Sequence, residues 1–423
     1  MRRGLSGLTS RGRSFLAAGL TAICCAIVLG QPALTRVGVL LVALPLLCAV
    51  LVGRNRYQLA LSRTLSPGLV SAGAPATVQL TLRNEGRIRT GLLLVEDQLP
   101  YALGNRPRFV VDGLKPQTPR TTTYQVRSDV RGNFVIGPLL VRINDPFGMV
   151  ELGRSFHAST NLVVTPRITP LPPIPIGGAW TGAGDNRPRA FATGSAEDVS
   201  VREYRRGDDL RRVHWRSSAR TGELMVRREE QPWQSRATLV LDNRATAHRG
   251  TGAASSLEAA VAHTASIAAH LTQRGFTVRL VTADGEDPNS VWHDRSRGQD
   301  VSPILEALAV LETTRRAHLA TDWIADAGHQ GVLIAVLGEL DDHDHGALRR
   351  MRISGRRPLA MTLDVNAWTQ RNAAPAGRAA WLSSLGWAAI DLRPGDALAP
   401  AWQELGRRAD RPTGAPVAER SAP

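Results

Sequence analysis

Cysteine is scarce in this sequence, and lysine is almost absent. The three cysteines are Cys24, Cys25 and Cys48, and all of them lie in apolar runs near the N-terminus. This distribution excludes a disulfide-stabilised scaffold, and the spacing does not fit a zinc site. Lys115 is the only lysine, so nearly all of the positive charge behind the formal net charge of +15 comes from arginine.

Two explanations compete for this charge. A strongly basic chain is typical of proteins that bind nucleic acid or an anionic membrane. The alternative is a bias in composition, which is favoured because alanine, glycine and proline are abundant as well. Composition alone therefore does not lead us to expect nucleic acid as a partner. With 423 residues, 43% of them hydrophobic, the chain has room for two or three domains with their own cores.

Residues 1–60 contain two uncharged apolar runs, Ser14 to Leu34 and Val37 to Gly53. At about 1.5 Å per residue, the first run approaches the roughly 30 Å thickness of a bilayer core. Arginines precede the first run and follow the second, whereas Arg36 alone lies in the turn between them. The positive-inside rule predicts a multi-pass hairpin in the cell membrane, with the bulk of the chain in the cytoplasm. The alternative is a cleaved signal peptide.

Residues 61–165 change to alternating apolar and polar positions, which are typical of half-buried strands. Turns that carry glycine, proline or asparagine separate most of the candidate strands, at 77–83, 92–95, 108–111, 122–126, 134–136, 139–143 and 162–164. This spacing predicts a β-sandwich. We expect Phe147, in the turn Asp145–Gly148, to fill one end of the sandwich, because aromatic residues in turns usually pack.

A segment rich in proline and glycine, residues 166–193, has the composition of a linker. In residues 194–409, an arginine-rich entry stretch is followed by apolar strands that alternate with helical patterns. The candidate strands are 237–242, 276–282, 331–337, 358–365 and 388–392, and the candidate helices are 257–271, 303–311, 346–351, 379–385 and 399–408. This alternation predicts a multi-domain chain whose last domain is an α/β fold with helices on both faces of a mostly parallel sheet. Residues 410–423 have the polar composition of a disordered tail.

Several short motifs occur together in the chain. They are Arg131–Pro138 and Asp145–Gly148, then Arg202–Tyr204, Gly207–Asp208, Arg211–Trp215 and Ser218–Arg220. With the two apolar N-terminal runs, they resemble the domain-of-unknown-function family number 58. The resemblance implies a von Willebrand factor A-like C-terminal domain and a MoxR-type AAA+ ATPase as partner. It implies no reaction.

Domains of the A type often bind a divalent cation through an Asp-x-Ser-x-Ser motif after the first strand, because carboxylate and hydroxyl oxygens suit magnesium. The corresponding residues here are Asp242 and Thr246, and Arg244 replaces the first serine. Since a guanidinium is permanently charged, we expect Arg244 to pair with Asp242 and take the place of the cation. We therefore expect no cofactor, and Asp242 and Thr246 are the weaker, metal-binding alternative.

The run Asp341–His345 holds the densest group of metal-ligand residue types. It could hold a transition metal. A solvated turn, with Asp342 or Asp344 near the start of the next helix, is the interpretation we favour.

The entry stretch places nine arginines between Arg202 and Arg228. Arginine binds carboxylates in a bidentate manner, so the stretch is either a structural ion-pair network or a docking surface for an acidic partner. We assign Arg202 and Arg220 to the first role, packed against Tyr204 and Trp215. The adjacent arginines are assigned to docking, which gives the candidate set Arg202, Tyr204, Arg205, Arg206, Asp208, Arg211, His214, Trp215, Arg220, Arg227 and Arg228. His214 and Trp215 are interpreted as a hydrogen-bonded neighbour and a core residue rather than as a catalytic pair.

No residue pattern in the chain resembles a nucleophile with its base. We therefore expect a membrane-anchored, non-enzymatic interaction or assembly protein. Two alternatives remain: an arginine-rich binder of anionic lipid or nucleic acid, and a metal-dependent enzyme that uses Asp242 or Asp341–His345. The salt dependence of binding tests the first alternative, and metal analysis tests the second.

Overall fold

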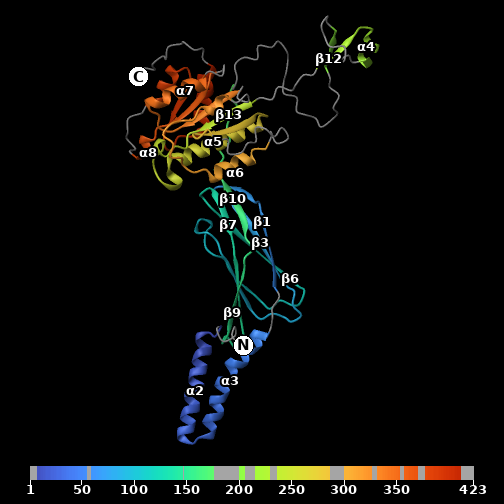
Figure 1. The fold of residues 1–423 in the computed structure, drawn as a ribbon, viewed down its shortest axis with the longest axis vertical. Coiled ribbons are helices and arrows are strands. Elements are labelled where there is room, and N and C mark those ends of the chain that lie inside the picture. The colour runs from blue at the N-terminus through green and yellow to red at the C-terminus, as the bar shows by residue number, and fades with distance from the viewer. Residues whose placement is uncertain are drawn as a thin grey trace.

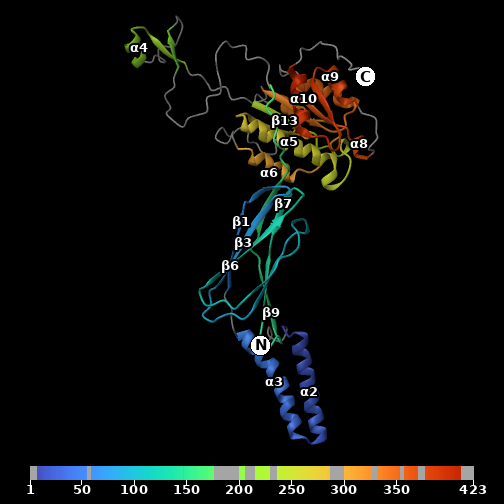
Figure 2. The ribbon, with the colours of Figure 1, turned by 180° about the vertical axis from the view of Figure 1, so that it is seen from behind.

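The computed structural model of the protein describes residues 7–54, 59–145, 147–175, 200–204, 215–228, 236–285, 300–325, 331–352, 357–369 and 377–410. These residues form a pair of long helices, a β-rich part and an α/β part. In Figures 1 and 2 the three parts follow one another along the long axis, with the helices at one end and the α/β part at the other.

The two N-terminal helices are α2 (Ser10–Leu29) and α3 (Pro32–Arg54), and both are long and apolar enough to cross a membrane. Gly30 ends α2 with a positive φ of 63°, which lets the chain reverse within two residues. Arg36 therefore lies inside α3 and not in the predicted turn. The helices approach closely where two glycines meet, because a Cβ on Gly38 would lie 3.0 Å from the carbonyl oxygen of Gly19.

The strands of the β-rich part confirm each of the predicted ones in this region and add three that the pattern did not predict: β1, β2 and β9. The bounds are β1 (Leu59–Ser66), β2 (Leu69–Ser71), β3 (Pro75–Asn84), β4 (Leu93–Asp97), β5 (Arg108–Val111), β6 (Pro119–Arg127), β7 (Gly132–Ile136), β8 (Leu139–Asn144), β9 (Glu151–Phe156) and β10 (Thr160–Thr165). They form sheets of order β1-β3-β6, β2-β10-β7 and β5-β4-β8-β9. Val78, Leu93 and Leu162, one from each sheet, are fully buried in one shared core.

A buried polar cluster ties these three sheets together. Arg63 Nη2 lies 2.6 Å from Asp97 Oδ1, and Tyr124 donates to Asp97 Oδ2 at 2.6 Å. Arg63 Nη1 also donates to the carbonyl oxygens of Ile136 and Ala158. The Arg63 and Asp97 side chains are 2% and 0% exposed, so this is a buried ion pair that the sequence analysis did not identify.

Phe147 does not fill the end of the β-rich part, and that expectation was wrong. Its side chain is 59% exposed, whereas Met149 and Val150 from the same loop are buried. The reason is local. Asp145 accepts hydrogen bonds from the backbone N–H groups of Phe147 and Val150, which closes the loop without any packing of the aromatic ring.

The α/β part confirms the predicted alternation of strands and helices. Its sheet is formed by β13 (Arg236–Leu241), β14 (Thr277–Thr282), β15 (Val332–Leu337), β16 (Leu359–Leu363) and β17 (Ala388–Leu392). All pairings are parallel, and the strand order is β14-β13-β15-β16-β17. The helices are α5 (Ser256–Gln273), α6 (Ser302–Val310), α7 (His345–Met351), α8 (Asn366–Thr369), α9 (Arg378–Ser384) and α10 (Leu398–Asp410).

The sheet has an apolar core on each face, as helices on both sides require. Along β13, Leu239 and Leu241 belong to the core that includes residues of α5, α6 and α10, whereas Val240 belongs to the core that includes residues of α7 and α9. Ser255 caps α5 by accepting from the N–H of Glu258. Figures 1 and 2 show α5 and α6 nearest to the β-rich part.

The first residues of the predicted linker pack against the α/β part. Ile174 is buried in its core, Thr169 donates its N–H to Ser266 Oγ, and Trp402 Nε1 donates to the carbonyl of Pro172. Arg131, in the family-like motif of the β-rich part, reaches across to Glu258 of α5 at 2.7 Å. The β-rich and α/β parts are therefore joined by packing and by an ion pair.

The described residues of the entry stretch form a small separate unit. Strands β11 (Ser200–Glu203) and β12 (Met225–Arg228) pair in antiparallel fashion, and α4 (Trp215–Thr221) lies next to β12. Ser218 of α4 accepts from the N–H of Met225, which attaches the helix to the hairpin. In both views this unit stands away from the central sheet.

Candidate functional site

The order of the parallel strands defines one position in the α/β part where ligands usually bind. When the five strands are numbered by their order in the chain, with β13 as strand 1, they lie across the sheet in the order 2-1-3-4-5. The topological switch point of this order lies between strands 1 and 3, which are β13 and β15. In open parallel sheets, ligands bind beyond the carboxyl ends of the two strands at this point. Asp242 follows β13 directly, and Gly338 and Glu339 follow β15.

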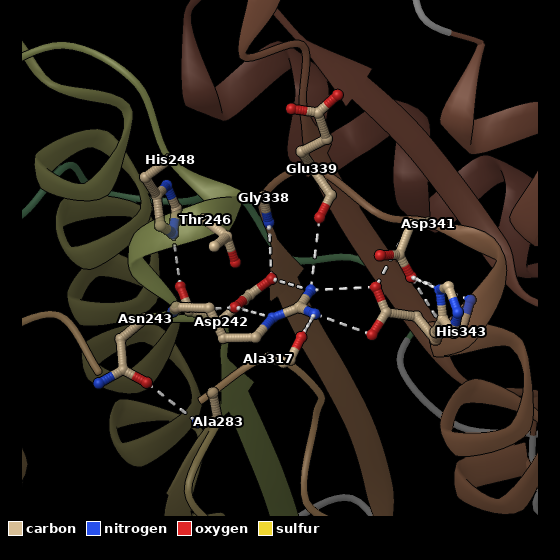
Figure 3. Close-up of polar contacts among 12 residues, drawn as sticks. Asp242, Asn243, Thr246, His248, Ala283, Ala317, Gly338, Glu339, Asp341 and His343 are labelled. Carbon is tan, nitrogen blue, oxygen red and sulfur yellow. Dashed lines mark hydrogen bonds and ion pairs between the residues drawn. The ribbon is translucent and has the colours of Figure 1, made fainter. Parts of the chain in front are cut away.

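Arg244 occupies this position with its own guanidinium, which donates to Asp242, Ala317 and Glu339. Figure 3 labels these three acceptor residues. Its Nε and Nη2 donate to the two carboxylate oxygens of Asp242 at 3.0 and 2.9 Å. Its Nη1 and Nη2 donate to the two oxygens of Asp344 at 2.9 and 3.1 Å. The same nitrogens also donate to the carbonyl oxygens of Ala317 and Glu339 at 3.0 and 3.3 Å. Every N–H direction of the guanidinium therefore has an acceptor.

The cluster is buried and strongly polar. The Arg244 side chain is 2% exposed, and those of Asp242 and Asp344 are 0% exposed. Burial by itself would lower the pKa of Arg244, but the hydrogen bonds and charges of Asp242 and Asp344 raise it above the ordinary arginine value. The N–H groups of Gly338 and Asp341 donate to the two carboxylates and help to balance their charge. The guanidinium is thus a permanent cation between two carboxylates.

His248 and Asn243 hold the loop that carries Arg244. His248 Nε2 lies 2.6 Å from the carbonyl oxygen of Asp242, which only accepts, so this nitrogen carries the proton. Nδ1 is 3.0 Å from Ser256 Oγ at the start of α5. Burial lowers the pKa of His248, which keeps the ring neutral. Asn243 accepts from the N–H of Ala283 and donates to the carbonyl of Glu312, which ties the loop to the neighbouring strand end.

The predicted pairing of Arg244 with Asp242 is confirmed, but the second carboxylate was not predicted. Asp344 was interpreted only as part of a solvated turn. It is 1% exposed and forms a capping box with Asp341 at the start of a short 3₁₀ helix. Asp344 reaches the guanidinium because β13 and β15 are neighbours in the sheet, which the strand pattern of the sequence does not specify.

The metal-binding candidates have different positions. Thr246 is exposed, so it does not share the buried cluster with Asp242. His343 and Asp341 are exposed, 3.6 Å apart, and belong to a cap rather than to a cavity. Among the residues that the structure describes, no three histidine, cysteine or acidic side chains are close enough to hold a metal ion.

The structure describes only part of the arginine-rich candidate set. Arg205, Arg206, Asp208, Arg211 and His214 lie outside the described residues. The paired strands hold the backbones of Arg202, Arg227 and Arg228, and the half-buried Tyr204 donates its N–H to the carbonyl of Leu224.

Two expectations for the entry stretch were wrong. Trp215 is not a core residue, because its side chain is 71% exposed at the start of α4. Arg220 is exposed too, so it is not the partly buried structural tie that the sequence suggested. Among the residues that the structure describes, this unit consists of two four-residue strands and a seven-residue helix, which offer little apolar surface for an indole ring.

Comparison with known proteins gives a family without a defined activity. Residues 200–366 match the model of a family described as "Protein of unknown function DUF58". The match confirms the resemblance predicted from the motifs, and it spans β11 to β16 with both Arg244 and Asp344. No curated protein matches the chain.

Two solved structures are similar to about a quarter of the chain. One is the CARDB domain of a Pyrococcus furiosus protein, with 17% identity, a TM-score of 0.20, and coverage of 26% of this chain and 93% of that one. The other is a Bordetella pertussis protein assigned as ApaA, with 13% identity, a TM-score of 0.21, and coverage of 26% and 94%.

Proposed function

Because residues 200–366 match a family of unknown function and two N-terminal helices are long enough to cross a membrane, we propose that the protein is a membrane-anchored, non-enzymatic interaction protein. Its helices form a multi-pass anchor in the cell membrane, and its α/β part is a von Willebrand factor A-like domain in the cytoplasm. The entry stretch binds an acidic surface of a partner. The family resemblance makes a MoxR-type AAA+ ATPase the first partner to test.

The observation that carries this proposal is the position of Arg244. Its guanidinium lies at the switch point of the sheet and makes six hydrogen bonds to protein acceptors there. A substrate or a cation at this point would have to displace a buried, doubly paired arginine, and breaking such pairs is costly. The position therefore supports a structural role for the switch point and a binding role for other surfaces.

The von Willebrand factor A-like assignment is supported by the same residues. Such domains carry the first aspartate of their cation motif at the carboxyl end of the first strand, and Asp242 lies there, directly after β13. Arg244, two positions later, supplies the positive charge. The arrangement fits an A-like domain in which an internal guanidinium replaces the divalent ion.

Exposure and charge support docking by the entry stretch. Residues 200–204 and 215–228 contain five arginines and two glutamates. Trp215 is 71% exposed, and Arg216 and Arg220 of the same helix α4 are exposed as well. Tryptophan and arginine are the residues most enriched among binding hot spots, and arginine pairs well with carboxylates. An acidic partner surface with an apolar pocket fits this composition.

The test is direct binding between the full chain in nanodiscs and a purified MoxR-type ATPase from the same organism. Trp215→Ala should weaken binding by about 30-fold or more, which corresponds to a loss of about 2 kcal/mol at a hot spot. Tyr101→Ala, which removes a 98% exposed aromatic residue from the β-rich part, is the matched control and should leave the Kd unchanged. Equal affinities of wild type and Trp215→Ala would refute the docking surface.

The topology has a separate test. A reporter fused after Pro423 should give the signal expected for the cytoplasm, because Arg11 and Arg13 lie at the end of the helix pair that adjoins the β-rich part. A signal from the opposite side of the membrane would refute the cytoplasmic assignment and with it the partnership with a cytoplasmic ATPase.

The alternatives are distinguished by chemistry. If the arginines bind nucleic acid or anionic vesicles, the affinity should fall steeply with salt. If the protein is a metal-dependent enzyme, the purified full chain should retain a stoichiometric metal that Asp242→Asn removes.

A further inference from the structure

The loop between β8 and β9 is attached to the N-terminal end of the helix pair. Thr9, the N-cap of α2, donates its N–H to the carbonyl of Met149 at 2.9 Å and its hydroxyl to that of Gly148 at 2.7 Å. Glu151 donates its N–H to the carbonyl of Gly7 at 2.8 Å. Figures 1 and 2 both show β9 close to the ends of the helices. The position of this loop is therefore fixed relative to α2.

The same loop packs against α3 at a level where that helix is still apolar. Met149 and Val150 are 4% and 1% exposed and form a small core with Cys48 and Ala49. Cys48 lies six residues before the end of α3, which is about 9 Å along the helix axis. On both sides of this contact, the apolar side chains of α3 are exposed, with Leu47 at 57% and Val50 at 44%. The loop thus reaches the depth at which the helix surface is suited to lipid.

Phe147 projects from this loop and is not part of the small apolar core that Met149 and Val150 form. Its side chain is 59% exposed, and its N–H is held by Asp145 Oδ2 at 3.0 Å. Gly148 follows with a positive φ of 67°, and a Cβ at this glycine would lie 3.6 Å from Arg11 Nη1. An exposed aromatic side chain near the arginine-containing end of two membrane-length helices suits the boundary between headgroups and acyl chains.

We infer that Phe147 inserts into the interfacial layer of the lipid bilayer, so that the β-rich part rests on the membrane through the β8–β9 loop. The ligand is the boundary of headgroups and acyl chains, and no lipid of a particular type is required. This inference rests on the proposed membrane anchoring by α2 and α3. It adds a third membrane contact, which comes from a part of the chain far from the helices in sequence.

The experiment is photocrosslinking of the full chain in liposomes that contain an alkyne-tagged phosphatidylcholine. Benzoylphenylalanine replaces one residue at a time: Phe147, Leu40 in the middle of α3, or Tyr101. Leu40 is 65% exposed and reports on the helix pair. Tyr101 is the control because it lies far from the β8–β9 loop. It comes shortly after Asp97, and Asp97 pairs with Leu139, the first residue of β8, whereas the loop follows the last residue of that strand.

Lipid adducts at positions 147 and 40 without adducts at 101 are the expected result. Adducts at 40 but not at 147 would overturn the inference and leave the membrane anchor intact. The absence of adducts at both 40 and 147 would overturn the anchor as well. A protein adduct at 147 in cell membranes, in place of a lipid adduct, would identify Phe147 as a protein contact and would also overturn the inference.

Discussion

Replacing Arg244 with serine removes the guanidinium that pairs with two buried carboxylates. The six hydrogen bonds of the guanidinium are lost, and Asp242 and Asp344, both 0% exposed, have no counter-ion within the cluster. Breaking a buried pair by removing one partner costs about 3–5 kcal/mol. Since two carboxylates are stranded here, we expect the upper end of that range, about 5 kcal/mol.

This loss of unfolding free energy should be visible in a thermal scan. For a domain of this size, about 1 kcal/mol corresponds to about 2–4 °C, so the Tm should fall by about 10–20 °C. The scan is done on the full chain in detergent with a chelator present. As the control, Arg349→Ser removes an exposed arginine from α7 and should change the Tm little.

The variant should also gain a response to divalent cations that the wild type lacks. Arg244→Ser leaves two carboxylates and two carbonyl oxygens around the space of the guanidinium, and magnesium prefers such hard oxygen ligands. At a magnesium concentration of about 100 times the Kd, binding would restore about 2.7 kcal/mol. Adding Asp344→Asn should abolish this rescue. A Tm of Arg244→Ser that equals the wild-type value, or a wild type that responds equally to magnesium, would refute the reasoning.

Four further predictions concern other parts of the chain. Arg63→Ala should destabilise the protein by about 3–5 kcal/mol in thermal unfolding, because it leaves Asp97 buried without its counter-ion. Arg108→Ala, which removes a mostly exposed arginine, is the control. A fall in Tm for Arg63→Ala as small as that for Arg108→Ala would contradict the prediction. Arg220→Ala should change the free energy of unfolding by less than about 0.5 kcal/mol, since the residue is exposed; a large fall in Tm would revive its role as a structural tie. Gly38→Leu should separate α2 from α3, because a Cβ there already lies 2.7 Å from Ile23 Cγ1, and proteolysis should become faster than in Ala33→Leu. Burial lowers the pKa of His263 to about 4, so below about pH 6.5 the folded state binds fewer protons than the unfolded state, and the free energy of unfolding should fall as the pH drops from about 6.5 to 4. In His263→Gln this fall in the free energy of unfolding should be smaller, by about 3 kcal/mol at most. A pH profile of stability that is the same in wild type and variant would contradict the assignment.

The sequence by itself determined the types of element and the cores they build. Period-two and helical patterns located seven of the ten strands in the β-rich part and all five strands of the α/β sheet, because burial of one face imposes that spacing on the chain. The pairing of Asp242 with Arg244 was also local, since two residues of separation leave little freedom to a guanidinium.

Only the tertiary structure decided which distant groups meet. Asp344 lies 100 residues after Arg244, and it reaches the guanidinium because β13 and β15 are neighbours in the sheet. The exposure of Phe147 and Trp215 was decided at the same level: whether an aromatic ring is covered depends on the surfaces that surround it in space, which the spacing of its own segment does not specify.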